Sequence, residues 1–159
     1  MTLEQLYRQC RKKLTHETAD FDLSQLFHAQ FAQYVGRARP EIEVPSDEAF
    51  VFQHKIKRLS EGYPLQYLLG EWEFYSIPLA VGEGVLIPRP DTETLVDTAL
   101  EFMHSHKAPV IADLCAGSGA IALALAEHLP SAQLFAVELS SDALRYLRRN
   151  IEARSLGAR

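Results

Sequence analysis

The sequence predicts an α-helical N-terminal domain over residues 1–70, a β-hairpin linker over 71–90, and the first β-α-β-α part of a doubly wound α/β domain over 91–159. Three observations support this fold class. Apolar residues recur at helical spacing throughout the first part. Polar and aromatic residues alternate from Glu71 onward, as they do in a half-exposed strand. Two short apolar runs, 109–114 and 133–138, then alternate with helical patterns, which is the order of a parallel sheet.

The composition is that of a globular, mildly acidic protein. The 159 residues are 47% hydrophobic and 23% charged, with a formal net charge of −5. No stretch reaches the roughly 20 apolar residues that a membrane-spanning helix needs, and the acidity argues against direct nucleic-acid binding. The two cysteines, Cys10 and Cys115, match no disulfide framework or metal motif. We therefore expect reduced thiols in a cytoplasmic protein without a metal site.

Two helices are expected at the start of the chain. The first follows Thr2, which can form a capping box with Gln5. The second has Asp22 as its expected N-cap and ends before Gly36 and Pro40, which break the chain. The apolar stripes that predict them are Leu3, Leu6, Tyr7, Cys10 and Leu14 for the first helix, and Leu23, Leu26, Phe27, Phe31 and Tyr34 for the second.

A third helix is expected from Ser46 until Gly62 stops it, and a short helical turn should follow between Pro64 and Gly70. The expected stripe of the third helix is Phe50, Val51, His54 and Leu59.

The linker should be a hairpin with one arm at 71–75 and turn residues at Pro78, Gly82 and Gly84. Its second arm is expected at 85–87. Asp91 should then cap a helix. The apolar residues expected on that helix are Leu95, Val96, Ala99, Leu100 and Met103.

The last part reads as strand, helix, strand and helix. We expect a short buried strand at 109–114, a helix to about Ala126, a strand at 133–138, and a helix capped by Ser140 or Ser141. Two parallel strands cannot bury both faces of a sheet. We therefore expect the 159 residues to be part of a longer protein; the alternative is a small two-stranded domain that a partner chain completes.

The turn after the first of these strands is a candidate cofactor loop. Gly117 and Gly119 lack a Cβ, so the backbone can approach a ligand closely. The loop lies at the carboxyl end of a parallel strand, where α/β proteins bind ligands. Glu138 ends the next strand, and a carboxylate there can accept hydrogen bonds from both hydroxyls of a ribose. The pattern predicts a nucleoside cofactor.

Two cofactor classes fit this loop. The run from Gly117 to Ala122 matches the dinucleotide pattern G-x-G-x-x-A, which favours an oxidoreductase. Asp113, just before the loop, favours the other class, because a carboxylate suits the cationic sulfonium and ammonium groups of S-adenosyl-L-methionine better than it suits a diphosphate.

Two segments resemble the release factor glutamine methyltransferases. Residues 64–70 read Pro-Leu-Gln-Tyr-Leu-Leu-Gly, and residues 87–93 read Ile-Pro-Arg-Pro-Asp-Thr-Glu, although the family usually has Glu where this chain has Asp91. The resemblance covers the whole chain as an N-terminal portion of the family. It implies a Rossmann-like S-adenosyl-L-methionine-dependent methyltransferase domain. It also implies that the substrates are peptide-chain release factors, whose Gly-Gly-Gln motif is methylated on the glutamine side-chain amide.

The resemblance maps the family's cofactor loop onto residues 115–119 and its ribose-binding acid onto Glu138. The family usually reads Asp-Leu-Gly-Thr-Gly-Ser-Gly here, so Cys115 and Ala116 depart from its pattern. The expected cofactor-binding residues are Asp113, Cys115, Ala116, Gly117, Ser118, Gly119 and Glu138.

The family's catalytic motif, Asn-Pro-Pro-Tyr, is absent, because Asn150 is the only asparagine and Ile151 follows it. We therefore expect no catalytic residue in this chain and no methyltransferase activity from it alone. A non-catalytic module that binds release factors through its helical domain is a further alternative.

Overall fold

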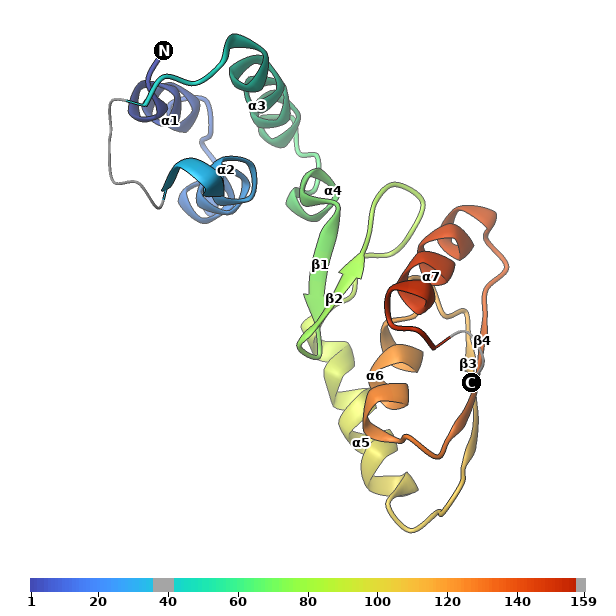
Figure 1. The fold of residues 1–159 in the computed structure, drawn as a ribbon. Coiled ribbons are helices and arrows are strands. Elements are labelled where there is room, and N and C mark those ends of the chain that lie inside the picture. The colour runs from blue at the N-terminus through green and yellow to red at the C-terminus, as the bar shows by residue number, and fades with distance from the viewer. Residues whose placement is uncertain (36–41, 157–159) are drawn as a thin grey trace. The chain divides into compact units, whose positions relative to one another are not determined.

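The computed structural model describes residues 1–35 and 42–156, which form two compact units, Met1–Leu69 and Gly70–Arg159 (Figure 1). The expected chain breakers Gly36 and Pro40 lie outside the described residues. None of the described helices is long and apolar enough to cross a membrane.

The first unit is helical. Its elements are α1 (Leu3–Arg11), α2 (Ala19–Val35), α3 (Ser46–Ser60) and α4 (Leu65–Leu69). The capping box is confirmed: the Gln5 backbone N–H donates to the Thr2 hydroxyl at 3.3 Å, and the Thr2 N–H donates to the Gln5 side chain at 3.0 Å. Gly62 follows α3 with φ of +87°, which confirms the expected stop.

The expected N-cap of α2 is wrong. The helix begins at Ala19, and the Asp22 N–H donates to the Thr18 carbonyl at 2.9 Å. A residue whose own N–H is bonded in this way lies inside the first turn and cannot be the cap. The Asp22 carboxylate instead accepts from the Thr18 hydroxyl at 3.0 Å and contacts His16 Nε2 at 2.9 Å.

The expected apolar face of α3 is also wrong, except at Leu59. The buried residues are Ala49, Phe52, Ile56 and Leu59, which follow a strict i, i+3, i+7, i+10 spacing. Phe50 is 71% exposed and lies on the opposite side of the helix, together with Val51 and His54. The prediction took the adjacent large apolar residues at 50 and 51 as the buried side of the helix, and that side is exposed.

The second unit combines a hairpin with a parallel pair of strands. Its elements are β1 (Glu71–Phe74), β2 (Ile77–Ala80), the 3₁₀ turn η1 (Pro90–Thr92), α5 (Glu93–Met103), β3 (Val110–Leu114), α6 (Ala120–His128), β4 (Gln133–Val137) and α7 (Ser141–Ala153). Ser140 caps α7, because its hydroxyl accepts from the Ala143 N–H at 3.3 Å.

The hairpin is shorter than expected. Its turn is Tyr75–Ser76, with φ of +52° and +61°, and its second arm contains Pro78. Both positive φ values fit the tight turn that joins two strands directly. Contacts from α5 hold this turn: the Tyr75 N–H donates to the Glu93 carboxylate at 2.8 Å, and the Tyr75 hydroxyl donates to Asp97 at 2.7 Å. Local turn chemistry could not reveal these tertiary contacts.

The expected second arm, 85–87, is not a strand, although Val85 and Ile87 are buried. This segment follows a loop that packs on α7. A Cβ added at Gly82 would lie 2.2 Å from the Tyr146 hydroxyl, so a larger residue at this position would displace the Tyr146 ring.

Asp91 does not cap α5. It lies in η1, and α5 begins two residues later at Glu93, without a side-chain cap. The 3₁₀ turn separates Asp91 from the helix, because the Thr92 N–H donates to the Arg89 carbonyl at 3.0 Å. Val96 is fully buried as expected, whereas Leu95 is 54% exposed.

β3 and β4 are parallel, with Asp113 opposite Ala136. The three helices α5, α6 and α7 lie on one side of this pair (Figure 1). Val110 and Leu114, on the other side, are 67% and 70% exposed, so the expected burial of the first strand is wrong. Among the described residues no element covers this outer face, which explains the exposure.

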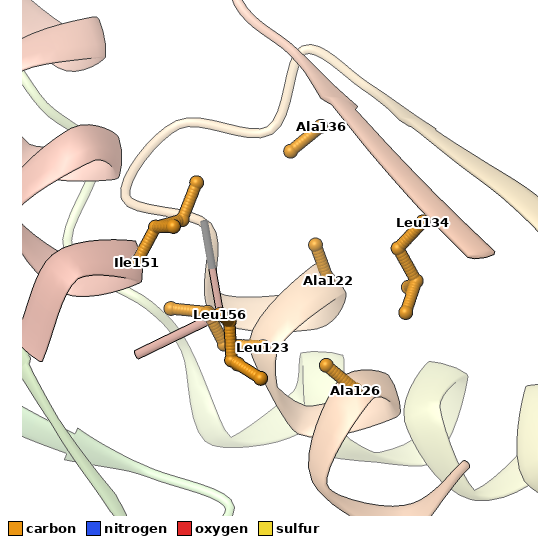
Figure 2. A pocket seen from close by; sticks show the side chains of 7 residues that line it. All are labelled: Ala122, Leu123, Ala126, Leu134, Ala136, Ile151 and Leu156. Carbon is orange, nitrogen blue, oxygen red and sulfur yellow. The ribbon is translucent and has the colours of Figure 1, made fainter. Parts of the chain in front are cut away.

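A small apolar cavity of about 90 Å³ lies between α6, β4 and the end of α7 (Figure 2). Its lining residues are Ala122, Leu123, Ala126, Leu134, Ala136, Ile151 and Leu156. None of these lining residues, which all belong to the described part of the chain, has an ionisable or hydrogen-bonding side chain. A cofactor with polar groups is therefore expected elsewhere, at the strand ends.

Candidate functional site

The candidate cofactor loop and Glu138 lie together at one edge of the sheet. Leu114 and Val137 are partners at the carboxyl ends of β3 and β4, so the residues that follow them emerge side by side. The Ala116 N–H donates to the Val137 carbonyl at 3.0 Å and extends the pairing into the loop. The structure thus brings together the loop and the acid that the sequence singled out.

Glu138 binds the loop directly. Its carboxylate accepts from the Gly117 N–H and from the Ser140 N–H, each at 2.8 Å. The backbone N–H of Ser140, followed by that of Gly117, holds the pKa of the Glu138 carboxyl below its ordinary value. The group is therefore a carboxylate at neutral pH. The Leu139 N–H also bonds to this carboxylate and lowers its pKa. A carboxylate offers about four acceptor positions, so it can still accept from a ligand hydroxyl.

The two loop glycines serve different purposes. Gly117 has φ of +59°, and a Cβ placed there would meet no atom within 4 Å, so this side of the loop is open. Gly119 has φ of +84°, and a Cβ there would lie 2.6 Å from Leu147 Cδ1 of α7. Gly119 is therefore needed for packing inside the unit, whereas the open backbone at Gly117 can approach a ligand.

Cys115 is exposed and has φ of +63°. A residue with a Cβ pays roughly 1–2 kcal/mol in this left-handed region. The glycine that the family usually has here would avoid that cost. The departure at Cys115 thus leaves the loop with a strained residue, while Ala116 beside it is buried.

Asp113 has a structural role that the sequence reasoning missed. Its Oδ2 accepts from the Ala122 N–H at 3.1 Å, in the first turn of α6. Gly119, the N-cap of that helix, has no side chain, so Asp113 supplies the capping carboxylate from β3. Burial raises the pKa of the Asp113 carboxyl, the Ala122 N–H lowers it, and the charge of Glu138 raises it further.

Asn150 is the second residue that was missed. It lies on α7 and is 4% exposed, and its side-chain amide bonds to the backbone of Ser118 in the loop and of Ala80 in β2. A signal was present: Asn150 continues the buried face of Ala143 and Leu147 at helical spacing, where a polar residue needs a partner.

The described residues contain no group of three or more His, Cys, Asp or Glu side chains arranged to hold a metal ion. Cys10, in the first unit, is buried and free. The polar groups that the described residues bring to the loop are its backbone N–H groups and the carboxylates of Asp113 and Glu138.

Two protein families match this chain. Residues 5–70 match the family described as the PrmC N-terminal domain, and residues 92–159 match the methyltransferase small domain. Residues 71–91, which include the β1–β2 hairpin, lie between the two matches.

Individual relatives agree with these matches. The release factor glutamine methyltransferase of Thermodesulfovibrio yellowstonii is 44% identical over 110 residues, which are 68% of this chain and 39% of the relative. The enzyme of the same name from Moorella thermoacetica is 44% identical over 122 residues, covering 77% of this chain and 43% of the relative. That of Rhodopirellula baltica is 39% identical over 139 residues, covering 84% and 47%.

The chain therefore spans less than half the length of these curated relatives. The first unit matches a PrmC N-terminal domain, the second matches a methyltransferase small domain, and the relatives share one name. By these matches, the chain belongs to the family of release factor glutamine methyltransferases.

Proposed function

We propose that the second unit binds S-adenosyl-L-methionine at the loop 115–119, and that the protein methylates the glutamine side-chain amide of the Gly-Gly-Gln motif in peptide-chain release factors. The observation that carries the proposal is the contact between the Glu138 carboxylate and the Gly117 N–H at 2.8 Å. This hydrogen bond places the acid beside the loop, so both can contact the nucleoside of one bound cofactor.

The residues of the loop fit this cofactor. The open side of Gly117 leaves room for the nucleoside. Glu138 is a carboxylate that keeps acceptor capacity beside its backbone N–H partners, which suits a ribose hydroxyl. Asp113 uses only Oδ2 in capping α6, so its charge is available to a cationic group. We propose the cofactor-binding set Asp113, Cys115, Ala116, Gly117, Ser118, Gly119 and Glu138.

The bound cofactor would supply an activated methyl group. The amide nitrogen of glutamine is a weak nucleophile, so the reaction depends on alignment of nitrogen, methyl and sulfur and on acceptors that orient the NH₂ group. This chain has the loop but no Asn-Pro-Pro-Tyr motif. We therefore propose that this polypeptide alone does not methylate release factors, although it binds the cofactor.

The rival dinucleotide function is less well supported. The charges of Asp113 and Glu138 both border the loop and would repel a diphosphate. We also propose a cytoplasmic location, in line with the unpaired thiols of Cys10 and Cys115. We propose release factors as partners, in line with the name that the relatives share.

Thermal shift separates the two cofactor classes. We expect S-adenosylhomocysteine to raise the melting temperature of this chain and NAD to leave it unchanged. The variant Asp113→Asn keeps an oxygen for the Ala122 N–H, so it should remain folded while it binds S-adenosylmethionine, which carries the sulfonium charge, less tightly. Stabilisation by NAD alone would replace the methyltransferase proposal with the oxidoreductase.

A further inference from the structure

The side-chain amide of Asn150 joins three segments that are far apart in the sequence. Its Oδ1 accepts from the Ala80 N–H at 2.7 Å. Its Nδ2 donates to the Ala80 carbonyl at 3.1 Å and to the Ser118 carbonyl at 2.9 Å. Both amide hydrogens and the carbonyl oxygen are thus used, and only an amide of this length offers that combination of donors and acceptor.

The bond to Ser118 fixes one peptide unit of the loop. The Ser118 carbonyl is held by Asn150, and the N–H of the same peptide, on Gly119, donates to the Ala116 carbonyl at 2.8 Å. A peptide plane held on both sides cannot rotate without breaking a hydrogen bond. This plane directly precedes α6, so its orientation determines how the loop enters the helix.

The bonds to Ala80 fix the other end of the link. The amide pairs with both the N–H and the carbonyl of Ala80, as a residue of a neighbouring strand would. Ala80 ends β2, whose partner β1 is paired through Glu71. The hairpin and the loop are therefore attached to one side chain.

We infer that Asn150 is a positioning residue for the cofactor loop, and that it couples the conformation of the loop to the β1–β2 hairpin. The inference rests on the proposed function for its effect on the cofactor. Its structural part, the fixing of the Ser118–Gly119 peptide, can be tested without any ligand.

The first measurement is amide hydrogen exchange in the ligand-free chain. Asn150→Ala should speed exchange at Gly119 and at Ala80 by about tenfold or more relative to Ala124, a buried residue in the middle of α6. Arg148→Gln, an exposed position on the same helix, is the matched control and should change neither. Asn150→Asp keeps the acceptor for the Ala80 N–H and loses the donor to Ser118, so it should speed exchange at Gly119 more than at Ala80.

The second measurement is the affinity for S-adenosylhomocysteine by calorimetry. Asn150→Ala should weaken binding by about tenfold, because the loop loses the hydrogen bond that fixes the Ser118–Gly119 peptide. Arg148→Gln should bind as the parent chain does. If Asn150→Ala speeds exchange at Gly119 no more than at Ala124, the inference is overturned. Failure of both Asn150 variants to fold would also overturn it, because Asn150 would then serve the unit as a whole. If the parent chain does not bind S-adenosylhomocysteine, the proposed function fails, and the exchange at Gly119 still decides the role of Asn150.

Discussion

At the scale of single residues, the two loop glycines differ in what surrounds them. Gly119→Ala should destabilise the second unit by about 2–4 kcal/mol, because it adds steric overlap with Leu147 to the cost of a positive φ. Gly117→Ala faces no neighbour within 4 Å and should cost only about 1 kcal/mol from its φ of +59°. Chemical denaturation of the two variants measures the difference. Equal losses would mean that the contact between Gly119 and α7 does not constrain the loop.

Glu138 predicts a dependence of stability on pH. Its pKa is lowered in the folded state, so it contributes stability above its ordinary pKa of 4.5 and loses that contribution as the pH falls through the lowered value. The free energy of unfolding of the parent chain should therefore fall more steeply below pH 4.5 than that of Glu138→Gln. Urea denaturation between neutral and acidic pH tests this. Parallel curves for the two proteins would contradict it.

At the scale of elements, Asp113 links β3 to the start of α6. Asp113→Ala removes the cap and should destabilise the unit by about 1 kcal/mol at neutral pH. Asp113→Asn keeps an acceptor for the Ala122 N–H and removes a charge whose pKa is raised by burial. A raised pKa means that the charged form is disfavoured in the folded state above the ordinary value of 3.8.

Asp113→Asn should consequently be at least as stable as the parent chain at neutral pH and more stable than Asp113→Ala. Thermal melts of the three proteins check the order. A loss in Asp113→Asn as large as that in Asp113→Ala would show that the charge, rather than the capping acceptor, stabilises α6.

The helices and strands of this chain were largely predictable, but their bounds and buried faces were less so. The strict signals succeeded: the capping box at Thr2, Gly62 after α3 and Ser140 before α7 each depend on neighbouring backbone alone. The position of the hairpin turn was wrong, because Tyr75, which has a positive φ, is held by contacts with α5 that are distant in sequence. The prediction that Asp91 caps α5 was wrong, because Asp91 lies in a 3₁₀ turn that precedes the helix.

The candidate site follows the same division. The position of Glu138 at the same sheet edge as the loop was expected from strand order, because parallel strands end at one edge; its hydrogen bond to the Gly117 N–H was not. The cap from Asp113 and the bridge from Asn150 were not, because each joins segments whose closeness arises only from tertiary packing. Which of these residues contact a cofactor stays a prediction.

At the scale of the whole molecule, the outer face of the β3–β4 pair is apolar. Its exposed apolar residues are Val110, Leu114, Phe135 and Val137, which are at least half exposed, and Leu139, just after β4, is 99% exposed. Exposed apolar patches and unpaired strand edges favour association. The polypeptide of 159 residues should therefore associate with itself as its concentration rises.

Sedimentation velocity over a range of concentrations measures this association. Phe135→Lys, in the middle of the outer face, should shift the chain toward monomer. Phe50→Lys is the matched control, because Phe50 is 71% exposed but lies on α3 of the first unit. Each substitution changes the formal net charge from −5 to −4, so both alter the overall repulsion between copies equally, and only a larger effect at Phe135 than at Phe50 attributes the association to the outer face. An equal effect of both, or a monomeric parent chain at every concentration, would contradict the prediction and would mean that the exposed strands are not enough to drive contact between copies.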